Sequence, residues 1–301
     1  MTSPFLLSDD VRVALQERQP IVALETSVLA QGLPSPRNLE LAVDLDLRIR
    51  AEGVVPAWTA VDDGAIRVGL SRERLEAISA PGARVAKVAR RDYPAVLAAG
   101  GMGATTVSAT LWAAAALGIE VMATGGIGGV HPRTGDVSAD LLEMARLPGL
   151  VVCAGPKSIV DPAATLERLE ELGVLVVGYG CDRLPFFLAR DAGLPLEHRV
   201  DTPAEAARLA RARVRLGVES AVLLCNPIPP DHALDAVAVS QAVAECERRA
   251  AAAGVTGKAV TPFLLSCLAE VTRGASLEAN LALLRANAAL AARIAAELAR
   301  G

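Results

Sequence analysis

The sequence predicts an α/β fold in which a mostly parallel central sheet is flanked by helices on both faces, as a single large domain over residues 1–301. Short apolar runs alternate with longer segments of helical periodicity along the whole chain, without an internal repeat or a low-complexity linker. Hydrophobic residues make up 52% of the chain and aromatic residues only 3%, so Ala, Val and Leu must fill the core. Such a core is typical of buried parallel strands covered by alanine-rich helices.

The first predicted elements are a strand, a helix and a hairpin. Pro20–Leu24 is short, apolar and rich in β-branched residues, which indicates a buried strand. Arg37–Gly53 has apolar residues at helical spacing and ends at a glycine. Val54–Val61 is the next strand, and the Asp62–Gly64 turn returns the chain into Ala65–Gly69 as a hairpin partner.

Later elements follow the same alternation. Ser71 is a suitable N-cap for a helix over Arg72–Ser79, and Ser138 caps a short helix that ends at Arg146. Asp161 and Pro162 open another helix, because Asp suits the N-cap and Pro the first turn. The further predicted strands are Arg84–Ala89, Ile119–Thr124, Leu150–Ala154, Val174–Val177 and Ser220–Leu224. The further predicted helices are Thr105–Leu117, Pro203–Leu216, Ala233–Ala252 and Ser276–Ala299.

Composition and charge exclude several classes of partner. The net charge is −4 and no Lys/Arg block occurs, so a nucleic-acid polymer is not expected, whereas a small phosphorylated ligand is compatible. The five cysteines are odd in number, form no CxxC pair and lie mostly in apolar runs, so we expect reduced core residues in a cytoplasmic protein. Met1–Asp10 lacks the features of a secretory signal, and no apolar run is long enough for a membrane span.

Unusual segments follow several predicted strands: Glu25–Ser27, Lys87, Gly125–Gly129, Gly155–Ser158 and Asn226–Pro227. Ligands of parallel α/β sheets bind at the carboxyl ends of the strands. These segments therefore predict one site at that edge.

Glu25 and Lys157 are the candidates for catalysis. A carboxyl group at the end of a buried strand is partly removed from water, which favours its protonated form and suits proton transfer. Lys157 follows a strand end with little side-chain bulk, where an apolar wall favours a neutral, nucleophilic amine. A capping or salt-bridged glutamate and an ordinary surface lysine are the alternative interpretations.

Phosphate and substrate contacts have their own candidates. Lys87, within an apolar strand, either points to solvent or pairs with an anion such as a phosphate or Glu25. Gly125–Gly129 allows close approach of a ligand to the backbone, or serves tight packing, and it does not match GxGxxG. Gly103–Ser108 combines a glycine, hydroxyl groups and a helix N-terminus, which is either a phosphate cradle or a plain capped helix.

Oxygen ligands for a hard cation gather just after the glycine-rich loop. Asp136 and Asp140 flank Ser138, and two carboxylates with a hydroxyl suit Mg²⁺ or Mn²⁺. Helix capping by the same residues is the alternative. The three histidines have no zinc-like spacing, and His131 lies closest to the predicted site.

These segments together resemble the pseudouridine-5′-phosphate glycosidase family (indigoidine synthase A-like proteins) over nearly the full chain. The segments that carry the resemblance are Val22–Ser27, Lys87–Asp92, Gly103–Val107, Ala123–His131, Asp136–Leu141, Val152–Ser158, Asn226–Pro229 and Thr261–Leu265. The resemblance implies a manganese-dependent lyase of the hydro-lyase class, a homotrimer with one Mn²⁺ per subunit, that interconverts pseudouridine 5′-phosphate and water with uracil and ribose 5-phosphate.

The resemblance also implies roles for single residues. Lys157 matches the nucleophile that forms an imine with the anomeric carbon after ring opening, and Glu25 matches the proton donor. Asp136 matches the manganese ligand, and a position in the last helix, Asn280, matches one that reaches the active site. The remaining matches are substrate-binding positions: Lys87, Val107, Ser138, Ala139 and Asp140.

The chemistry agrees with the residues. A C–C glycosidic bond has no leaving oxygen or nitrogen to protonate, so two-carboxylate catalysis suits it poorly and an imine supplies the electron sink instead. The chain departs from the family pattern at Gln31, where a histidine is usual, at Gly101, where a lysine is usual, and in a shorter loop between His131 and Asp136. Alternatives are a C–C glycosidase or lysine-dependent lyase acting on another sugar phosphate, and a sugar-phosphate sensor that would not need Lys157 and Glu25 together.

Overall fold

The structure is a computed structural model that describes residues 3–132 and 135–300. Its strands are β1 (Phe5–Leu7), β2 (Ile21–Glu25), β3 (Val55–Asp62), β4 (Ala65–Val68), β5 (Ala86–Val88), β6 (Gly103–Thr105), β7 (Val121–Ala123), β8 (Leu150–Cys153), β9 (Leu175–Tyr179), β10 (Arg199–Val200) and β11 (Val222–Cys225). Its α-helices are α1 (Asp9–Glu17), α2 (Arg37–Ala51), α3 (Arg72–Ser79), α4 (Tyr93–Ala99), α5 (Val107–Leu117), α6 (Ala139–Arg146), α7 (Pro162–Glu171), α8 (Pro203–Arg215), α9 (Ala236–Ala252), α10 (Val260–Val271) and α11 (Ala275–Ala299). The short turns are η1 (Val28–Gly32, π-helical), η2 (Arg90–Asp92), η3 (Pro230–His232) and η4 (Gly257–Ala259).

One mostly parallel sheet connects all the described strands, as predicted, in the order β1-β4-β3-β2-β7-β8-β11-β9-β10. The antiparallel pairs are β3 with β4, which is the predicted hairpin, and β3 with β6. Strand β5 extends from β6 in parallel. The sequence therefore predicted the mostly parallel sheet and the β3–β4 hairpin. It did not predict that β6 pairs with β3 in the antiparallel direction.

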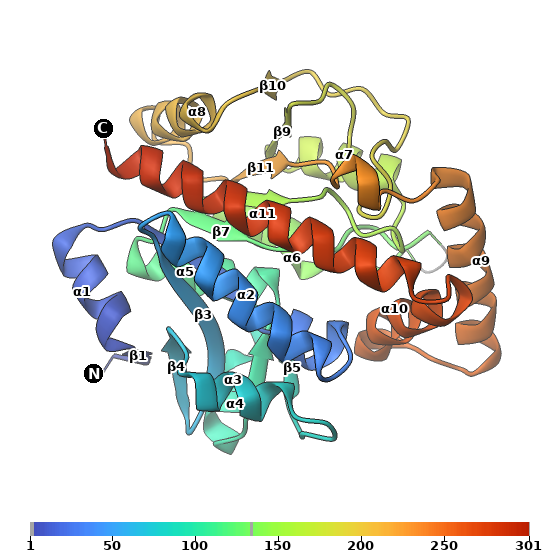
Figure 1. Cartoon of the computed structure of the whole chain (residues 1–301), viewed down its shortest axis with the longest axis horizontal. Coiled ribbons are helices and arrows are strands. Elements are labelled where there is room, and N and C mark those ends of the chain that lie inside the picture. The colour runs from blue at the N-terminus through green and yellow to red at the C-terminus, as the bar shows by residue number, and fades with distance from the viewer. Residues whose placement is uncertain (1–2, 133–134, 301) are drawn as a thin grey trace.

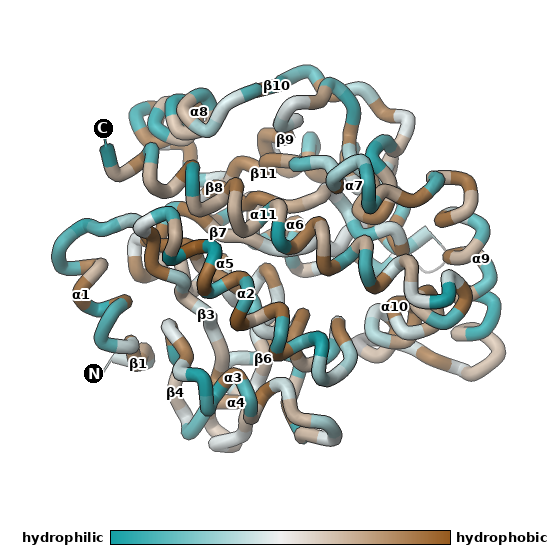
Figure 2. Tube along the Cα trace, in the orientation of Figure 1, coloured by the Kyte–Doolittle hydropathy of each residue, from teal (hydrophilic) through white to brown (hydrophobic). Residues whose placement is uncertain are grey.

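Helices cover both faces of this sheet. The last helix, α11, crosses one face beside α2 and above β7 (Figure 1). Alternate residues of a strand enter opposite hydrophobic clusters: Leu24 of β2 faces the α2 and α11 side, and Ala23 faces the α5 side. Figure 2 shows hydrophobic residues along the inner strands and hydrophilic residues on outer helices such as α1 and α9.

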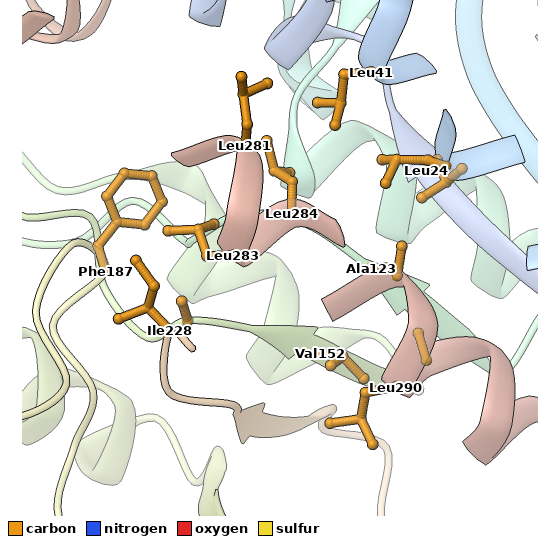
Figure 3. Packing of buried hydrophobic residues seen from close by; sticks show 14 of the residues in the cluster. Leu24, Leu41, Ala123, Val152, Phe187, Ile228, Leu281, Leu283, Leu284 and Leu290 are labelled. Carbon is orange, nitrogen blue, oxygen red and sulfur yellow. The ribbon is translucent and has the colours of Figure 1, made fainter. Parts of the chain in front are cut away.

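Aliphatic side chains fill the face under α11. Leu24, Ala123 and Val152 from three neighbouring strands lie in one cluster with Leu284 and Leu290 of α11 (Figure 3). These are small or medium-sized side chains, as the low aromatic content predicted. The predicted strand cores and the helices Arg72–Ser79, Pro203–Leu216 and Ser276–Ala299 are confirmed to within one or two residues.

One prediction is wrong in the fold, and another differs by two residues. The helix predicted over Thr105–Leu117 is confirmed but begins at Val107, because Gly103–Thr105 form β6 and extend the sheet beside β3. The cysteines are not all reduced, because Cys246 of α9 and Cys267 of α10 form a disulfide. The helices α1, α4 and α10 were not predicted.

The other three cysteines, Cys153, Cys181 and Cys225, are free. A hydrogen bond with the Cys153 thiol and complete burial raise the pKa of Cys225 well above its usual range, which keeps this thiol protonated. Cys153 and Cys225 are buried and fit the prediction of core residues, whereas Cys181 is only partly buried. Within the described residues, no helix has both the length and the apolar character needed to cross a membrane.

Candidate functional site

A cavity of about 360 Å³ lies where β2, β7 and β8 end. This volume is within the usual range for small-molecule sites. Its lining includes each residue that the sequence singled out for chemistry or binding through the resemblance: Glu25, Lys87, Val107, Asp136, Ser138, Ala139, Asp140, Lys157 and Asn280. The convergence predicted for the segments that follow strands therefore holds for Glu25, Lys87, Gly125 and Lys157, which all line this cavity. It fails for Asn226, whose side chain instead donates to Asn287 of α11 at 3.0 Å.

Glu25 is held at the last position of β2 by two hydroxyl groups. Its side chain is 4% exposed, and its carboxylate accepts hydrogen bonds from Ser27 at 2.5 Å and from Thr124. Thr124 follows β7, so the carboxyl group is oriented by the ends of two neighbouring strands. The next residue, Thr26, donates to the Thr59 carbonyl on β3 at 2.7 Å and fixes the turn that follows Glu25. A buried carboxyl group in a fixed orientation is suited to directed proton transfer.

Lys157 is held by pairing between two loops. Its backbone N–H donates to the Ile127 carbonyl at 2.9 Å, and the Ile127 N–H donates to the Gly155 carbonyl at 3.2 Å. Gly155 has φ +80°, and a Cβ there would lie 2.2 Å from the Pro185 carbonyl oxygen, so only glycine fits. The loop after β8 is thus fixed to the glycine-rich loop after β7, and Lys157 lines the same cavity as Glu25.

The glycine-rich loop combines close packing with access to the cavity. A Cβ on Gly126 would lie 2.7 Å from the Phe187 ring, and one on Gly128 would lie 2.4 Å from the Ser138 hydroxyl. Gly125, Gly126 and Gly128 also line the cavity. Both interpretations of this loop therefore apply, because the close packing is what places its backbone at the cavity wall.

Asp140 connects two parts of the site. One of its carboxylate oxygens accepts the Ser108 N–H at 3.0 Å and the other accepts the Gly128 N–H at 2.9 Å. Asp140 is 5% exposed, and the Ser138 hydroxyl accepts its N–H as the predicted helix cap. The carboxylate therefore positions the start of α5 and the glycine-rich loop.

The start of α5 has the features of an anion site. Thr106, Val107 and Ser108 line the cavity at the helix N-terminus, where N–H groups lack intrahelical acceptors. Lys87 of β5 and Arg91 of η2 line the same cavity and add positive charge. Arg91 was not singled out in the sequence, because it lies in a charged stretch that also suits a solvated turn.

Asp136, His131 and Lys87 are electrostatically coupled. Burial lowers the pKa of His131, the carboxylates of Asp136 and Glu247 oppose this shift, and Lys87 adds to it. Within residues 3–132 and 135–300, no group of three or more His, Cys, Asp and Glu side chains is placed to hold a metal. The loop that the sequence predicted to be short contains residues 133–134, which lie outside the described residues.

Two parts of the site were given no role from the sequence. Pro262 and Leu265 of α10 line the cavity. They lie in Thr261–Leu265, a segment that carried the family resemblance without a role assigned to its residues. Asn287 of α11 donates to the carbonyls of Thr124 and Gly125 at 2.9 and 3.3 Å, which ties the end of β7 to this helix. A buried asparagine in an apolar helix is the only available signal for that role.

Comparison with known proteins agrees with this geometry. Residues 10–297 match the family described as indigoidine synthase A like protein. A pseudouridine-5′-phosphate glycosidase of Paracoccus denitrificans is 49% identical over 297 residues, which cover 97% of this chain and 98% of that protein. The corresponding protein of Rhodospirillum centenum is 53% identical over 294 residues, covering 97% of this chain and 91% of its own length.

Solved structures show the same fold. The prealnumycin C-glycosynthase AlnA, in complex with ribulose 5-phosphate, has a TM-score of 0.91 and 37% sequence identity, and the match covers 100% of this chain and 98% of that chain. An indigoidine synthase A-like protein of Thermotoga maritima has a TM-score of 0.88 and 38% identity, with 93% and 94% covered. The chain therefore belongs to the indigoidine synthase A-like family.

Proposed function

We propose that this protein reversibly cleaves the C–C glycosidic bond of pseudouridine 5′-phosphate to give uracil and ribose 5-phosphate. The observation that carries the proposal is the presence of a lysine amine and a buried, oriented carboxyl group in one cavity, Lys157 and Glu25. Relatives at 49% and 53% identity bear the name of this activity.

In the proposed mechanism the Lys157 amine attacks C1′ of the sugar and the C1′–O4′ bond breaks, while Glu25 protonates O4′. The resulting ammonium of Lys157 returns a proton to Glu25. The nitrogen lone pair then forms an imine with C1′ as the bond from C1′ to C5 of the base breaks. Glu25 protonates C5, and water hydrolyses the imine to release ribose 5-phosphate and the free lysine.

The phosphate group is assigned to the wall with positive charge. Lys87, Arg91 and the N-terminus of α5 at Val107 line this wall, and together they suit a dianion. Ser138 and Ala139, at the first turn of α6, line the cavity and are assigned to sugar contacts. Asp140 is assigned to positioning the backbone around the substrate, because its two carboxylate oxygens accept the N–H groups of Ser108 and Gly128.

The carboxylates of the cavity fit a Mn²⁺ ion only if water supplies most of its ligands. Asp136 supplies a carboxylate to the cavity, whereas the Asp140 carboxylate already accepts two N–H groups. A hard divalent cation with one carboxylate takes its other ligands from water and substrate oxygens. Asp136 would hold one Mn²⁺ per subunit, which would position water and polar substrate groups. Isothermal titration with Mn²⁺ should give one site per chain, which Asp136→Ala abolishes.

A homotrimer and a cytoplasmic location complete the proposal. The trimer rests on the family resemblance, and a monomer by sedimentation at micromolar concentration would contradict it. Cytoplasmic location rests on the substrate, because a nucleotide monophosphate is charged and stays where it is made. Cys246 and Cys267 would then be exposed to reducing conditions in the cell.

A second candidate is a C–C glycosidase or lysine-dependent lyase acting on another sugar phosphate. The specific observation in its favour is the similarity to AlnA, a prealnumycin C-glycosynthase whose structure contains ribulose 5-phosphate. Gln31, where the family usually has histidine, lines the same cavity and permits a different aglycone.

The test is release of uracil from pseudouridine 5′-phosphate with Mn²⁺ present, for the native protein and for Lys157→Ala. Uracil from the native protein alone supports the proposal. A borohydride trap followed by mass spectrometry should give a covalent sugar-phosphate adduct at residue 157 of the native protein only. An inert native protein that still forms the adduct with ribose 5-phosphate would favour the second candidate.

A further inference from the structure

Two side-chain carbonyl oxygens in the cavity wall are buried without a hydrogen-bond partner among the described residues. They are Gln31 Oε1, from the π-helical turn after β2, and Asn280 Oδ1, from α11. A buried acceptor that remains unpaired costs about 1–3 kcal/mol, so a site that retains two of them is built for a ligand that donates hydrogen bonds.

The orientation of the Gln31 carboxamide is fixed. Its Nε2 donates to the Val85 carbonyl at 3.2 Å, just before β5, which leaves Oε1 as the free end. The other oxygen lies against the glycine-rich loop, since a Cβ on Gly125 would be 3.4 Å from Asn280 Oδ1. The π-helical turn after β2 and helix α11 therefore present these acceptors to the cavity that holds the proposed catalytic residues.

Both residues lie at the border between two cavities of different character. The cavity described above contains Glu25, Lys87 and Lys157, whereas an adjoining cavity of about 300 Å³ is lined by no charged residue among those described. Gln31 and Asn280 line both cavities. A sugar phosphate is expected on the charged side, because a phosphate dianion has no hydrogen to donate to a carbonyl oxygen.

The uncharged side suits a planar base. Phe187, Pro262 and Leu265 line both cavities next to the two carboxamides, and an aromatic ring with aliphatic neighbours packs well on a flat heterocycle. Uracil that is linked through C5 keeps both N1–H and N3–H as donors. Uracil that is linked through N1 keeps only N3–H.

We propose that Gln31 is a specificity-determining residue whose Oε1 accepts a hydrogen bond from a ring N–H of the C-linked base. This inference rests on the proposed function for the identity of the base. It concerns a position where the family resemblance leads one to expect a histidine and this chain has a glutamine. Asn280 Oδ1 is the second acceptor available to the same base.

The test combines one protein change with one substrate change. Native protein and Gln31→Met, which keeps side-chain length and removes the carboxamide, are compared on pseudouridine 5′-phosphate and its N1-methyl and N3-methyl derivatives. We measure kcat/KM for release of the base. Dissociation constants are measured for the same ligands in a Lys157→Ala background, where no turnover is needed. Circular dichroism and the thermal midpoint confirm that the variants are folded.

Methylation of the N–H that faces Gln31 should lower kcat/KM and affinity of the native protein about 10- to 100-fold. For Gln31→Met, kcat/KM and affinity for the unmethylated substrate should fall by a similar factor. The same methyl group should then change kcat/KM or affinity of this variant by less than about 3-fold. If Gln31→Met acted only through loss of the hydrogen bond to Val85, kcat/KM would fall equally for all three substrates. The discrimination against the methylated substrate would then remain.

Equal discrimination by the native protein and Gln31→Met against both methyl derivatives would overturn the inference. Absence of uracil release by the native protein, together with Gln31-dependent discrimination in the binding measurements, would refute the proposed reaction and support the inference. Uracil release by the native protein without Gln31-dependent discrimination would support the proposed reaction and refute the inference about Gln31.

Discussion

Replacement of Asp140 by alanine should destabilise the protein, although its carboxylate accepts hydrogen bonds from Ser108 and Gly128 and not from the proposed catalytic residues. The carboxylate accepts the Ser108 N–H at 3.0 Å and the Gly128 N–H at 2.9 Å in a position that is 5% exposed. Hydrogen bonds to a charged group contribute about 1.5–3 kcal/mol each, so removal of both should cost about 3–6 kcal/mol.

Asp140→Asn keeps one acceptor and directs an NH₂ group at the other backbone N–H. We expect it to lose about half as much, roughly 2–3 kcal/mol. The assay is urea unfolding followed by circular dichroism, with Asp231→Ala, an exposed aspartate in η3, as the matched control. The control should change the free energy of unfolding by less than about 0.5 kcal/mol.

The result that refutes this reasoning is an Asp140→Ala protein within about 1 kcal/mol of native. Such a result would mean that Ser108 and Gly128 find other acceptors without loss, and the carboxylate would then be available to a ligand. Titration of Asp140→Asn with ribose 5-phosphate would be the next measurement, because a ligand role predicts weaker binding in a protein of nearly native stability.

Three further predictions follow from the same structure. Gly126→Ala should lower the free energy of unfolding by about 1–3 kcal/mol and lower activity, because its Cβ would lie 2.7 Å from an aromatic ring. Gly101→Ala, whose Cβ would have nothing within 4 Å, should match native stability. Equal effects of the two changes in urea unfolding would contradict the packing argument. Reduction of Cys246–Cys267, which closes a separation of 21 residues, should lower the free energy of unfolding by about 3 kcal/mol. Dithiothreitol should have no such effect on the Cys246→Ser/Cys267→Ser double variant, and an unaffected native protein would argue against the bond. Because burial lowers the pKa of His131, the unfolded chain binds a proton at higher pH than the folded chain does, and stability should fall as pH drops below about 6.5. His131→Asn should show a shallower loss of stability between pH 7.5 and 5.5, and an unchanged slope would contradict the assignment.

The strands that form the sheet centre were predictable because they are buried on both faces. Segments such as Val22–Leu24 and Val151–Cys153 are apolar at every position, and glycine, proline or capping residues bound them. Strand β5 was predicted, but β6 and its antiparallel pairing with β3 were not. Thr105 and Thr106 precede an alanine-rich run and therefore resemble the start of a helix. What places Thr105 in a strand is a set of contacts distant in sequence, including its donation to the Thr59 carbonyl at 2.6 Å.

The disulfide shows a limit of the same kind. Cys246 and Cys267 lie in two helices whose apolar faces make each cysteine look like an ordinary core residue. Their pairing depends on the packing of α9 against α10, which brings the two Cα atoms to 5.6 Å. Helix α10 itself lacks a clear capping signal, since its N-cap position, Ala259, has no side-chain hydrogen bond.

The candidate site was more predictable than the fold around it, because chemistry restricts residue types at strand ends. Glu25 and Lys157 stand out because a charged residue at the end of a buried strand, or in the short turn after one, requires a reason. Gln31 was visible only as a departure from a family pattern. Its unpaired oxygen is a property of the folded chain, created when Val85 takes the other end of the carboxamide.

Helix α11 links the stability of the sheet to the geometry of the site. It packs on β2, β7 and β8 through its leucines, and its Asn287 holds the carbonyl of Thr124 at 2.9 Å. Thr124 in turn donates its hydroxyl to Glu25. The orientation of the proposed proton donor therefore depends on a helix near the end of the chain, and the same helix presents Asn280 to the cavity. Because Asn287 and Asn280 lie in the same helix, a change that shifts α11 should alter both the support of Glu25 through Thr124 and the position of the Asn280 side chain in the cavity wall.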